Sequence, residues 1–212
     1  MKETLGILAV IVGFIGYIPY FRTIFSGKTK PHAFSWLVWG TLTGIAFVSQ
    51  VAGNGGAGAW VTGFTALISF TIFGLALFKG VKDFPLTDWL CLAGSIIAIA
   101  LWALTKNPLI AVVLITIIDF VAFLPTIRKS YSEPNSEPIF TYSLSGLKFL
   151  IGIIALTELS WLTVLYPASL VMANGGFVVM LLIRRNKLAQ EQSSLALSPL
   201  TRSKVTQQRT HR

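Results

Sequence analysis

Residues 17–36 read YIPYFRTIFSGKTKPHAFSW, and residues 123–142 read FLPTIRKSYSEPNSEPIFTY. When the chain is laid over itself with an offset of 106 residues, the same residue types recur in both stretches and beside them. The identical pairs include Phe14/Phe120, Pro19/Pro125, Arg22/Arg128, Ser26/Ser132, Phe34/Phe140 and Gly40/Gly146. Chance alignment of apolar segments readily matches leucine with isoleucine, but it rarely matches proline, arginine, serine and glycine together. The sequence therefore predicts an internal repeat.

The composition indicates that this repeat lies in a membrane. Of the 212 residues, 54% are hydrophobic and 12% are charged, and the mean hydropathy is +0.72. A soluble domain carries about 25% charged residues. The apolar residues form seven blocks, each near the roughly 20 residues that a helix needs to cross a bilayer. They are Leu5–Phe21, Phe34–Val51, Trp60–Leu77, Trp89–Leu104, Leu109–Leu124, Phe140–Leu156 and Trp161–Ile183. We expect an all-α integral membrane protein with seven transmembrane helices.

The basic residues predict the orientation. Connections one, three and five hold Arg22, Lys28, Lys30, Lys79, Lys82, Arg128 and Lys129, and seven more basic residues follow Ile183. All of these fall on one side of a seven-span protein, whereas the other side has Lys2 and Lys106. Because positive charge gathers on the cytoplasmic side, we expect the N-terminus outside and the C-terminus in the cytoplasm. Trp60, Trp89, Trp161 and Tyr166 are expected in interfacial aromatic belts.

The charge pattern and the short loops also bear on partners and location. The net charge of +9 is mostly a topology signal, so no nucleic-acid partner is expected. The lipid bilayer is the expected surrounding, and the short loops favour a bacterial plasma membrane. A homo-oligomer is left open. The single Cys91 allows neither an intrachain disulfide nor a cysteine-based metal site.

The offset places the first span on the fifth and the second on the sixth, and the third should follow onto the seventh. Because each unit has an odd number of spans, an extra span is needed between two copies if both are to have the same orientation in the membrane. This 3+1+3 logic, with a repeated proline near the cytoplasmic end of the first span, resembles the PQ-loop and SWEET superfamily. The resemblance covers about Leu5–Ile183. The family's Pro-Gln is replaced by Pro19-Tyr20 and Pro125-Thr126.

The predicted division of the chain follows from the repeat. Residues 1–78 form the first three-helix repeat and residues 79–107 hold the linker helix. Residues 108–183 form the second repeat, and residues 184–212 form a basic cytoplasmic tail that we expect to be disordered because it is polar.

The resemblance implies a uniporter or exporter of a small polar solute, with sugar as the first expectation. It leaves open a proton-coupled amino-acid exporter of the cystinosin-like kind. It also leaves open a non-transporting receptor or sorting protein, because the KDEL-receptor group shares this topology. No catalytic or metal-binding motif stands in the sequence, so we expect no enzyme, no cofactor and no metal.

Four prolines are hinge candidates. A proline inside a helix removes a backbone donor and kinks the helix. Pro19 and Pro125 stand at matching places in the two repeats, so they could give the two bundles equivalent hinges. Pro31 and Pro138 open the second and sixth spans and complete a proline tetrad like that of the family. Their alternative role is only to start those helices.

Two charged residues fall inside predicted spans, where ionisable groups are functional candidates by default. Asp119 lies nine residues before Arg128, about 13 Å along a helix. Lys148 lies eight residues after Phe140, about 12 Å along the next helix, and hence at the same depth. We expect a structural Asp119–Lys148 ion pair inside the bundle, because a carboxylate neutralised by lysine is a poor proton carrier. The alternative, implied by cystinosin-like relatives, is that Asp119 is a proton site.

The resemblance also implies three solute-binding residues. SWEET-like proteins place an asparagine in the third and seventh spans, followed by small residues. Asn174 in MANGGF matches the seventh span, and Thr62 in AWVTGF stands at the corresponding place in the third. Phe47 stands near an aromatic platform for a sugar ring. For Asn174 the alternative is that its side chain satisfies helix carbonyls at the following glycines.

Overall fold

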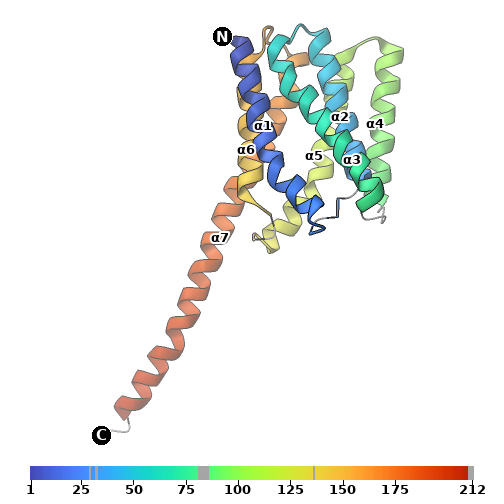
Figure 1. The fold of residues 1–212 in the computed structure, drawn as a ribbon. Helices are drawn as coiled ribbons and strands as arrows, with labels where there is room; N and C mark the ends of the chain where they lie inside the picture. The colour runs from blue at the N-terminus through green and yellow to red at the C-terminus, as the bar shows by residue number, and fades with distance from the viewer. Residues whose placement is uncertain (29, 32, 81–85, 136, 210–212) are drawn as a thin grey trace.

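The computed structural model describes residues 1–28, 30–31, 33–80, 86–135 and 137–209 (Figure 1). Its elements are α1 (Lys2–Phe25), α2 (Ala33–Ala52), η1 (Gly56–Ala59), α3 (Trp60–Lys79), α4 (Leu86–Thr105), α5 (Pro108–Ser132), α6 (Ile139–Ala155) and α7 (Trp161–Arg209). Each predicted span coincides with one helix, and only Leu156 falls one residue beyond the end of its helix. Within the described residues the predicted number of seven α-helices is confirmed. Of the basic residues, Lys82 and Arg212 lie outside the described part of the chain.

Residues 184–209 are helical in the structure, while the expectation that this tail is disordered stays a prediction. Helix α7 continues without a break to Arg209 and projects beyond the bundle (Figure 1). Residues 187–192 are lysine, leucine, alanine, glutamine and glutamate, which all favour helix. The helix is also held where it leaves the bundle. Arg185 donates from Nε to the carbonyl of Pro134 at 2.9 Å and from Nη2 to that of Glu137 at 2.7 Å.

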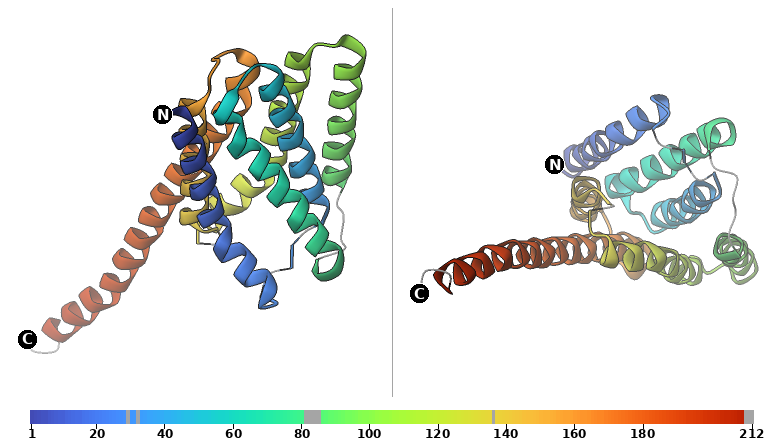
Figure 2. Two further views of the ribbon diagram at one scale, coloured as in Figure 1. Left: turned by 45° about the horizontal axis from the view of Figure 1, so that its top comes forward. Right: turned by 90° about the horizontal axis from the view of Figure 1, so that it is seen from below.

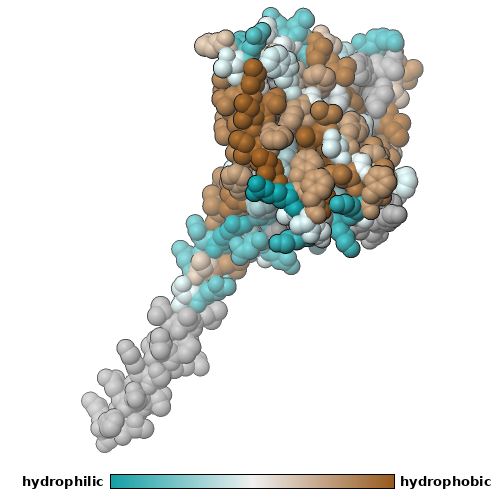
Figure 3. Space-filling view, viewed as in Figure 1, coloured by the Kyte–Doolittle hydropathy of each residue, from teal (hydrophilic) through white to brown (hydrophobic). Residues whose placement is uncertain are grey.

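The surface of the bundle is apolar around its middle. Among the residues that the structure describes, five helices are long and apolar enough to cross a membrane, namely α1, α2, α3 together with η1, α5 and the first part of α7. Helix α6 is apolar but shorter. Side chains such as Leu67, Phe78 and Ile117 are 65%, 90% and 55% exposed. Figure 3 shows hydrophobic residues over the middle of the bundle and hydrophilic residues near its two ends.

The helices alternate in direction and pack in two groups. Helix α3 packs against both α1 and α2, and α7 packs against both α5 and α6 (Figure 2). The two groups meet where α1 packs against α6 and where α2 packs against α5. Helix α4 packs against α5 and α2. An exchange of α1, α2 and α3 for α5, α6 and α7 therefore reproduces the pattern of contacts.

One aromatic contact recurs with the same offset as the sequence. The rings of Tyr17 and Trp36 lie 6.4 Å apart, and those of Phe123 and Tyr142, each 106 residues later, lie 6.1 Å apart. This pair of ring contacts therefore follows the offset of the sequence.

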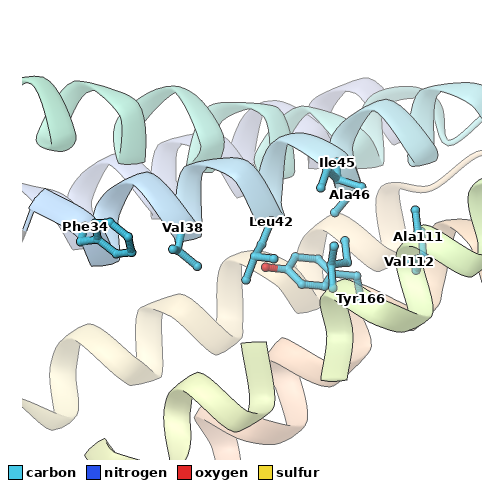
Figure 4. Packing of buried hydrophobic residues seen from close by; sticks show 9 residues of the cluster. Phe34, Val38, Leu42, Ile45, Ala46, Ala111, Val112 and Tyr166 are labelled. Carbon is cyan, nitrogen blue, oxygen red and sulfur yellow. The ribbon is translucent and has the colours of Figure 1, made fainter. Parts of the chain in front are cut away.

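The larger core cluster lies where α2, α5 and α7 meet. Its members are Phe34, Val38, Leu42, Ile45, Ala46, Ala111, Val112, Ile115 and Tyr166, most of which Figure 4 labels. A smaller cluster of Ala9, Val61 and Phe149 lies where α1, α3 and α6 meet. The two clusters thus occupy the two equivalent contacts between the groups.

The two groups of helices are joined by close contacts at the end of the bundle where the N-terminus of the chain lies. The amide of Thr157 donates to the carbonyl of Gly55 at 3.0 Å, and Lys2 donates from Nζ to the carbonyl of Leu156. A Cβ on Gly58 would lie 2.5 Å from the carbonyl oxygen of Gly152, so only glycine allows this approach of η1 to α6. We call this region the N-terminal end of the bundle.

Candidate functional site

Lys148, in the second half of α6, is the centre of a polar cluster drawn from three helices. Its side chain is 3% exposed. The ammonium nitrogen donates to Oγ1 of Thr65 on α3 at 3.0 Å and, at a longer 3.4 Å, to the hydroxyl of Tyr17 on α1. The same nitrogen lies 4.7 Å from the ring centroid of Tyr17 and 4.8 Å from that of Phe149. Thr65 offers a lone pair to the lysine because its own hydroxyl donates to the carbonyl of Val61 at 2.7 Å.

A glycine on α1 makes room for the lysine. A Cβ on Gly13 would lie 3.2 Å from Cδ of Lys148 and 3.2 Å from Cε1 of Phe64. A larger residue at position 13 would therefore push the lysine stem away from its partners. Gly13 is the repeat counterpart of Asp119, so the two repeats use this position differently.

The predicted ion pair between Asp119 and Lys148 is not formed. Within the described part of the chain, Lys148 bonds hydroxyl groups and no carboxylate. The reason is the order of the helices. We expected consecutive spans to be neighbours at every depth, whereas α6 packs mainly on α1 and α7, and α5 packs on α2, α4 and α7.

Asp119 lies near the other contact between the groups. It is half-buried on α5 and makes no hydrogen bond or ion pair with the residues described. Helix α5 makes this contact with α2. Tyr166 is 2% exposed and lies in the core beside Leu42 (Figure 4), so its expected place in an interfacial belt is wrong.

Asn174 lies at the contact of α6 and α7. Its side-chain amide donates from Nδ2 to the carbonyl of Leu170 at 2.7 Å, and the residue is 8% exposed. A Cβ on Gly146 would lie 3.5 Å from Cβ of Asn174. The side chain thus bonds a carbonyl of its own helix, but this carbonyl belongs to Leu170, four residues before Asn174, and not to the following glycines, so both roles of Asn174 stay predictions.

Thr62 and Phe47 lie together on the first repeat, away from Asn174. A Cβ on Gly63 would lie 2.8 Å from the ring of Phe47, so this ring packs on α3 next to Thr62. Thr62 is 0% exposed, and its Oγ1 has no hydrogen-bond partner among the described residues. Its neighbour Val61 faces Gly152 of α6, whereas Asn174 faces Gly146. Six residues along a helix are about 9 Å, so the neighbour of Thr62 and Asn174 contact α6 at different heights, and a joint binding site for the three residues stays a prediction.

The four prolines fall at two kinds of position. Pro19 lies inside α1 and is exposed, and Pro125 lies inside α5. Pro138 is the N-cap of α6, and Pro31 lies two residues before the start of α2. The helix-start role thus describes Pro31 and Pro138, while the hinge role of all four stays a prediction.

Two residues of the lysine cluster were missed by sequence reasoning. Tyr17 stands in the first repeated stretch, and neither Tyr17 nor Thr65 belongs to a site motif in the sequence. Thr65 and Tyr17 are 83 and 131 residues from Lys148, so no local pattern could have joined them.

Comparisons with protein-family models, curated proteins and solved structures found no match. Among the described residues, no group of three or more His, Cys, Asp or Glu side chains could hold a metal ion. Any assignment of function therefore depends on the packing and the polar contacts of the chain itself.

Proposed function

We propose that this chain is an integral membrane protein that moves a small polar solute by alternating access between two three-helix bundles. In this proposal α4 joins the bundles in a 3+1+3 arrangement, the N-terminus faces outward and the C-terminus faces the cytoplasm. The observation that carries the proposal is the repeated packing, in which α1 meets α6 as α5 meets α2. Transporters built from repeats bind their solute where the repeats meet and expose it by rocking one repeat against the other.

The position of the charged residues supports this proposal. Lys148 lies at the α1–α6 contact, and Asp119 lies on α5, which makes the equivalent contact with α2. Ionisable groups deep in a membrane protein are costly and usually serve function. Both therefore stand where a solute would pass between the bundles.

The choice of solute stays a proposal with two candidates. Sugar is implied by the resemblance, with Asn174, Thr62 and Phe47 as its binding residues. The buried charges favour the second candidate, a solute that carries charge, which includes the amino acids of cystinosin-like exporters. A non-transporting receptor would bind such a solute without moving it.

A cross-link at the N-terminal end of the bundle tests alternating access. A Cβ on Gly53 would lie 3.3 Å from Cγ of Leu162, close to where a cysteine sulfur at position 162 would sit. The Gly53→Cys/Leu162→Cys pair should therefore form a disulfide that joins the two repeats. The background should carry Cys91→Ser, and the two single-cysteine variants serve as controls.

The assay is uptake of radiolabelled sugars, amino acids and organic acids into proteoliposomes, with and without a pH gradient. Oxidation should abolish uptake by the double variant, reduction should restore it, and the single variants should not respond. Uptake that is unaffected by the verified cross-link would contradict rocking of the repeats. Saturable binding without uptake of any solute would favour the receptor.

A further inference from the structure

We propose that Lys148, Tyr17 and Thr65 bind a carboxylate group of the solute. This inference rests on the proposed function, because it names the chemical class of what passes between the bundles. It concerns a small organic anion or a zwitterion with a free carboxylate, rather than a neutral sugar.

The first argument is the charge that the fold leaves uncompensated. A buried ammonium group is costly unless an opposite charge or several hydrogen bonds accompany it. Lys148 is 3% exposed and is surrounded by hydroxyl groups and aromatic faces, and no described carboxylate pairs with it. Ring faces and neutral hydroxyls offset part of the cost of burial. A carboxylate brought by a ligand would supply the missing negative charge.

The second argument is the count of free donors. An ammonium has three N–H groups, and Lys148 uses two of them, on Thr65 and Tyr17. The hydroxyl of Tyr17 accepts from the lysine, and its own hydrogen has no acceptor in the described structure. The hydrogen of Thr65 is used on the carbonyl of Val61. One N–H and one O–H thus remain on atoms 3.4 Å apart, which suits the two oxygens of one carboxylate.

The third argument is the surroundings of these donors. The ring of Tyr17 lies 6.5 Å from that of Phe64 in an edge-to-face contact, and the ring of Phe149 also lies beside the ammonium. A phosphate group would need several cations or backbone amides, since it carries more charge and more acceptor oxygens. A single ammonium between apolar rings fits a singly charged carboxylate with an organic body.

The repeat limits the number of sites to one. The counterpart of Lys148 in the first repeat is Leu42, which is fully buried in the larger core cluster. The position equivalent to Lys148 at the contact between α2 and α5 therefore carries no cation. One carboxylate should bind per chain.

The test compares ligands that differ only in the charged group. The full chain in lipid nanodiscs is titrated by calorimetry with glucuronate and glucose, and with lactate and lactamide. The same ligands are then tested for uptake into proteoliposomes. The variants are Lys148→Met, which removes the ammonium, and Tyr17→Phe, which keeps the ring and removes the hydroxyl. Lys187→Met makes the first change at an exposed residue of α7 and is the matched control.

We expect at least one carboxylate to bind with a stoichiometry near one and roughly tenfold or more tightly than its neutral analogue. Lys148→Met should weaken this binding by roughly 10- to 100-fold and Tyr17→Phe by roughly 3- to 10-fold, while Lys187→Met should not change it. If Lys148→Met does not give a monodisperse protein, the effect of Tyr17→Phe and the comparison with the neutral ligands still test whether a carboxylate binds here.

Equal binding of the charged and neutral ligands, binding that ignores Lys148→Met, or no binding of either carboxylate at millimolar concentration would overturn the inference. The proposed transport function would be refuted by a different result. Carboxylate binding that needs Lys148 but is never followed by uptake would support the site and refute transport. Uptake of glucose that is indifferent to Lys148→Met, without carboxylate binding, would support transport and refute the site.

Discussion

Replacement of Gly58 by alanine tests whether the contact of η1 with α6 holds the N-terminal end of the bundle together. The added Cβ would lie 2.5 Å from the carbonyl oxygen of Gly152, 2.5 Å from the amide nitrogen of Leu156 and 2.7 Å from Cα of Leu156. Ordinary contacts begin near 3.4 Å, so the two segments would have to separate by nearly 1 Å. All three atoms belong to the backbone, and no side-chain rotation can relieve the clash.

The cost depends on the contacts that this separation would disturb. Overpacking of a well-packed site costs about 1–3 kcal/mol, and the upper value applies here because the neighbours are backbone atoms. The hydrogen bond from Thr157 to Gly55, 3.0 Å long, lies in the same region and would lengthen. Replacement of glycine by alanine also lowers the conformational entropy of the unfolded chain, which stabilises the folded state by about 0.4–1 kcal/mol. We expect a net loss of about 2 kcal/mol in the free energy of unfolding.

The matched control is Gly74→Ala on α3. No atom lies within 4 Å of the Cβ position there, and the residue is inside a helix. Alanine should therefore stabilise the chain by up to about 1 kcal/mol. Unfolding by increasing SDS in mixed micelles, followed by circular dichroism, measures both variants. A Gly58→Ala protein as stable as the wild type, or equal destabilisation by both changes, would refute the reasoning.

Three further outcomes follow from the structure. The losses of stability caused by Asp119→Asn and Lys148→Met should add to within about 0.5 kcal/mol in the double variant, because the two side chains form no ion pair in the described structure. A coupling energy above about 1 kcal/mol in the same unfolding assay would contradict this result and support the ion pair that the sequence suggested. Arg185→Met removes two charge-assisted hydrogen bonds to the α5–α6 connection, so amide exchange there should accelerate roughly tenfold or more, whereas Lys187→Met should leave it unchanged. A cysteine placed at Asn54, which is exposed in the turn before η1, should react with an impermeant reagent from outside, and its protection would contradict the proposed orientation.

The positions of the helices were determined by the sequence itself. Each apolar block became one helix, because a run of apolar residues near the length of a bilayer is a local property that needs no knowledge of the fold. The repeat was equally visible, since an offset of 106 residues joins Tyr17 with Phe123 and Trp36 with Tyr142 before any contact is known. The helical form of residues 184–209 was not expected from their polarity, because a polar segment of helix-forming residues can extend a helix that is already nucleated.

Only the tertiary structure decided which helices meet and what each buried polar residue contacts. Lys148 contacts Tyr17 and Thr65 because α6 packs against α1 and also contacts α3. It does not contact Asp119, because α5 packs against α2 and α7 instead. Tyr166 became part of the core for the same reason, since α7 packs between α5 and α6 with this face toward α2. Such contacts depend on the order of helices around the bundle, and hydropathy along one helix is the same whichever neighbour lies beside it.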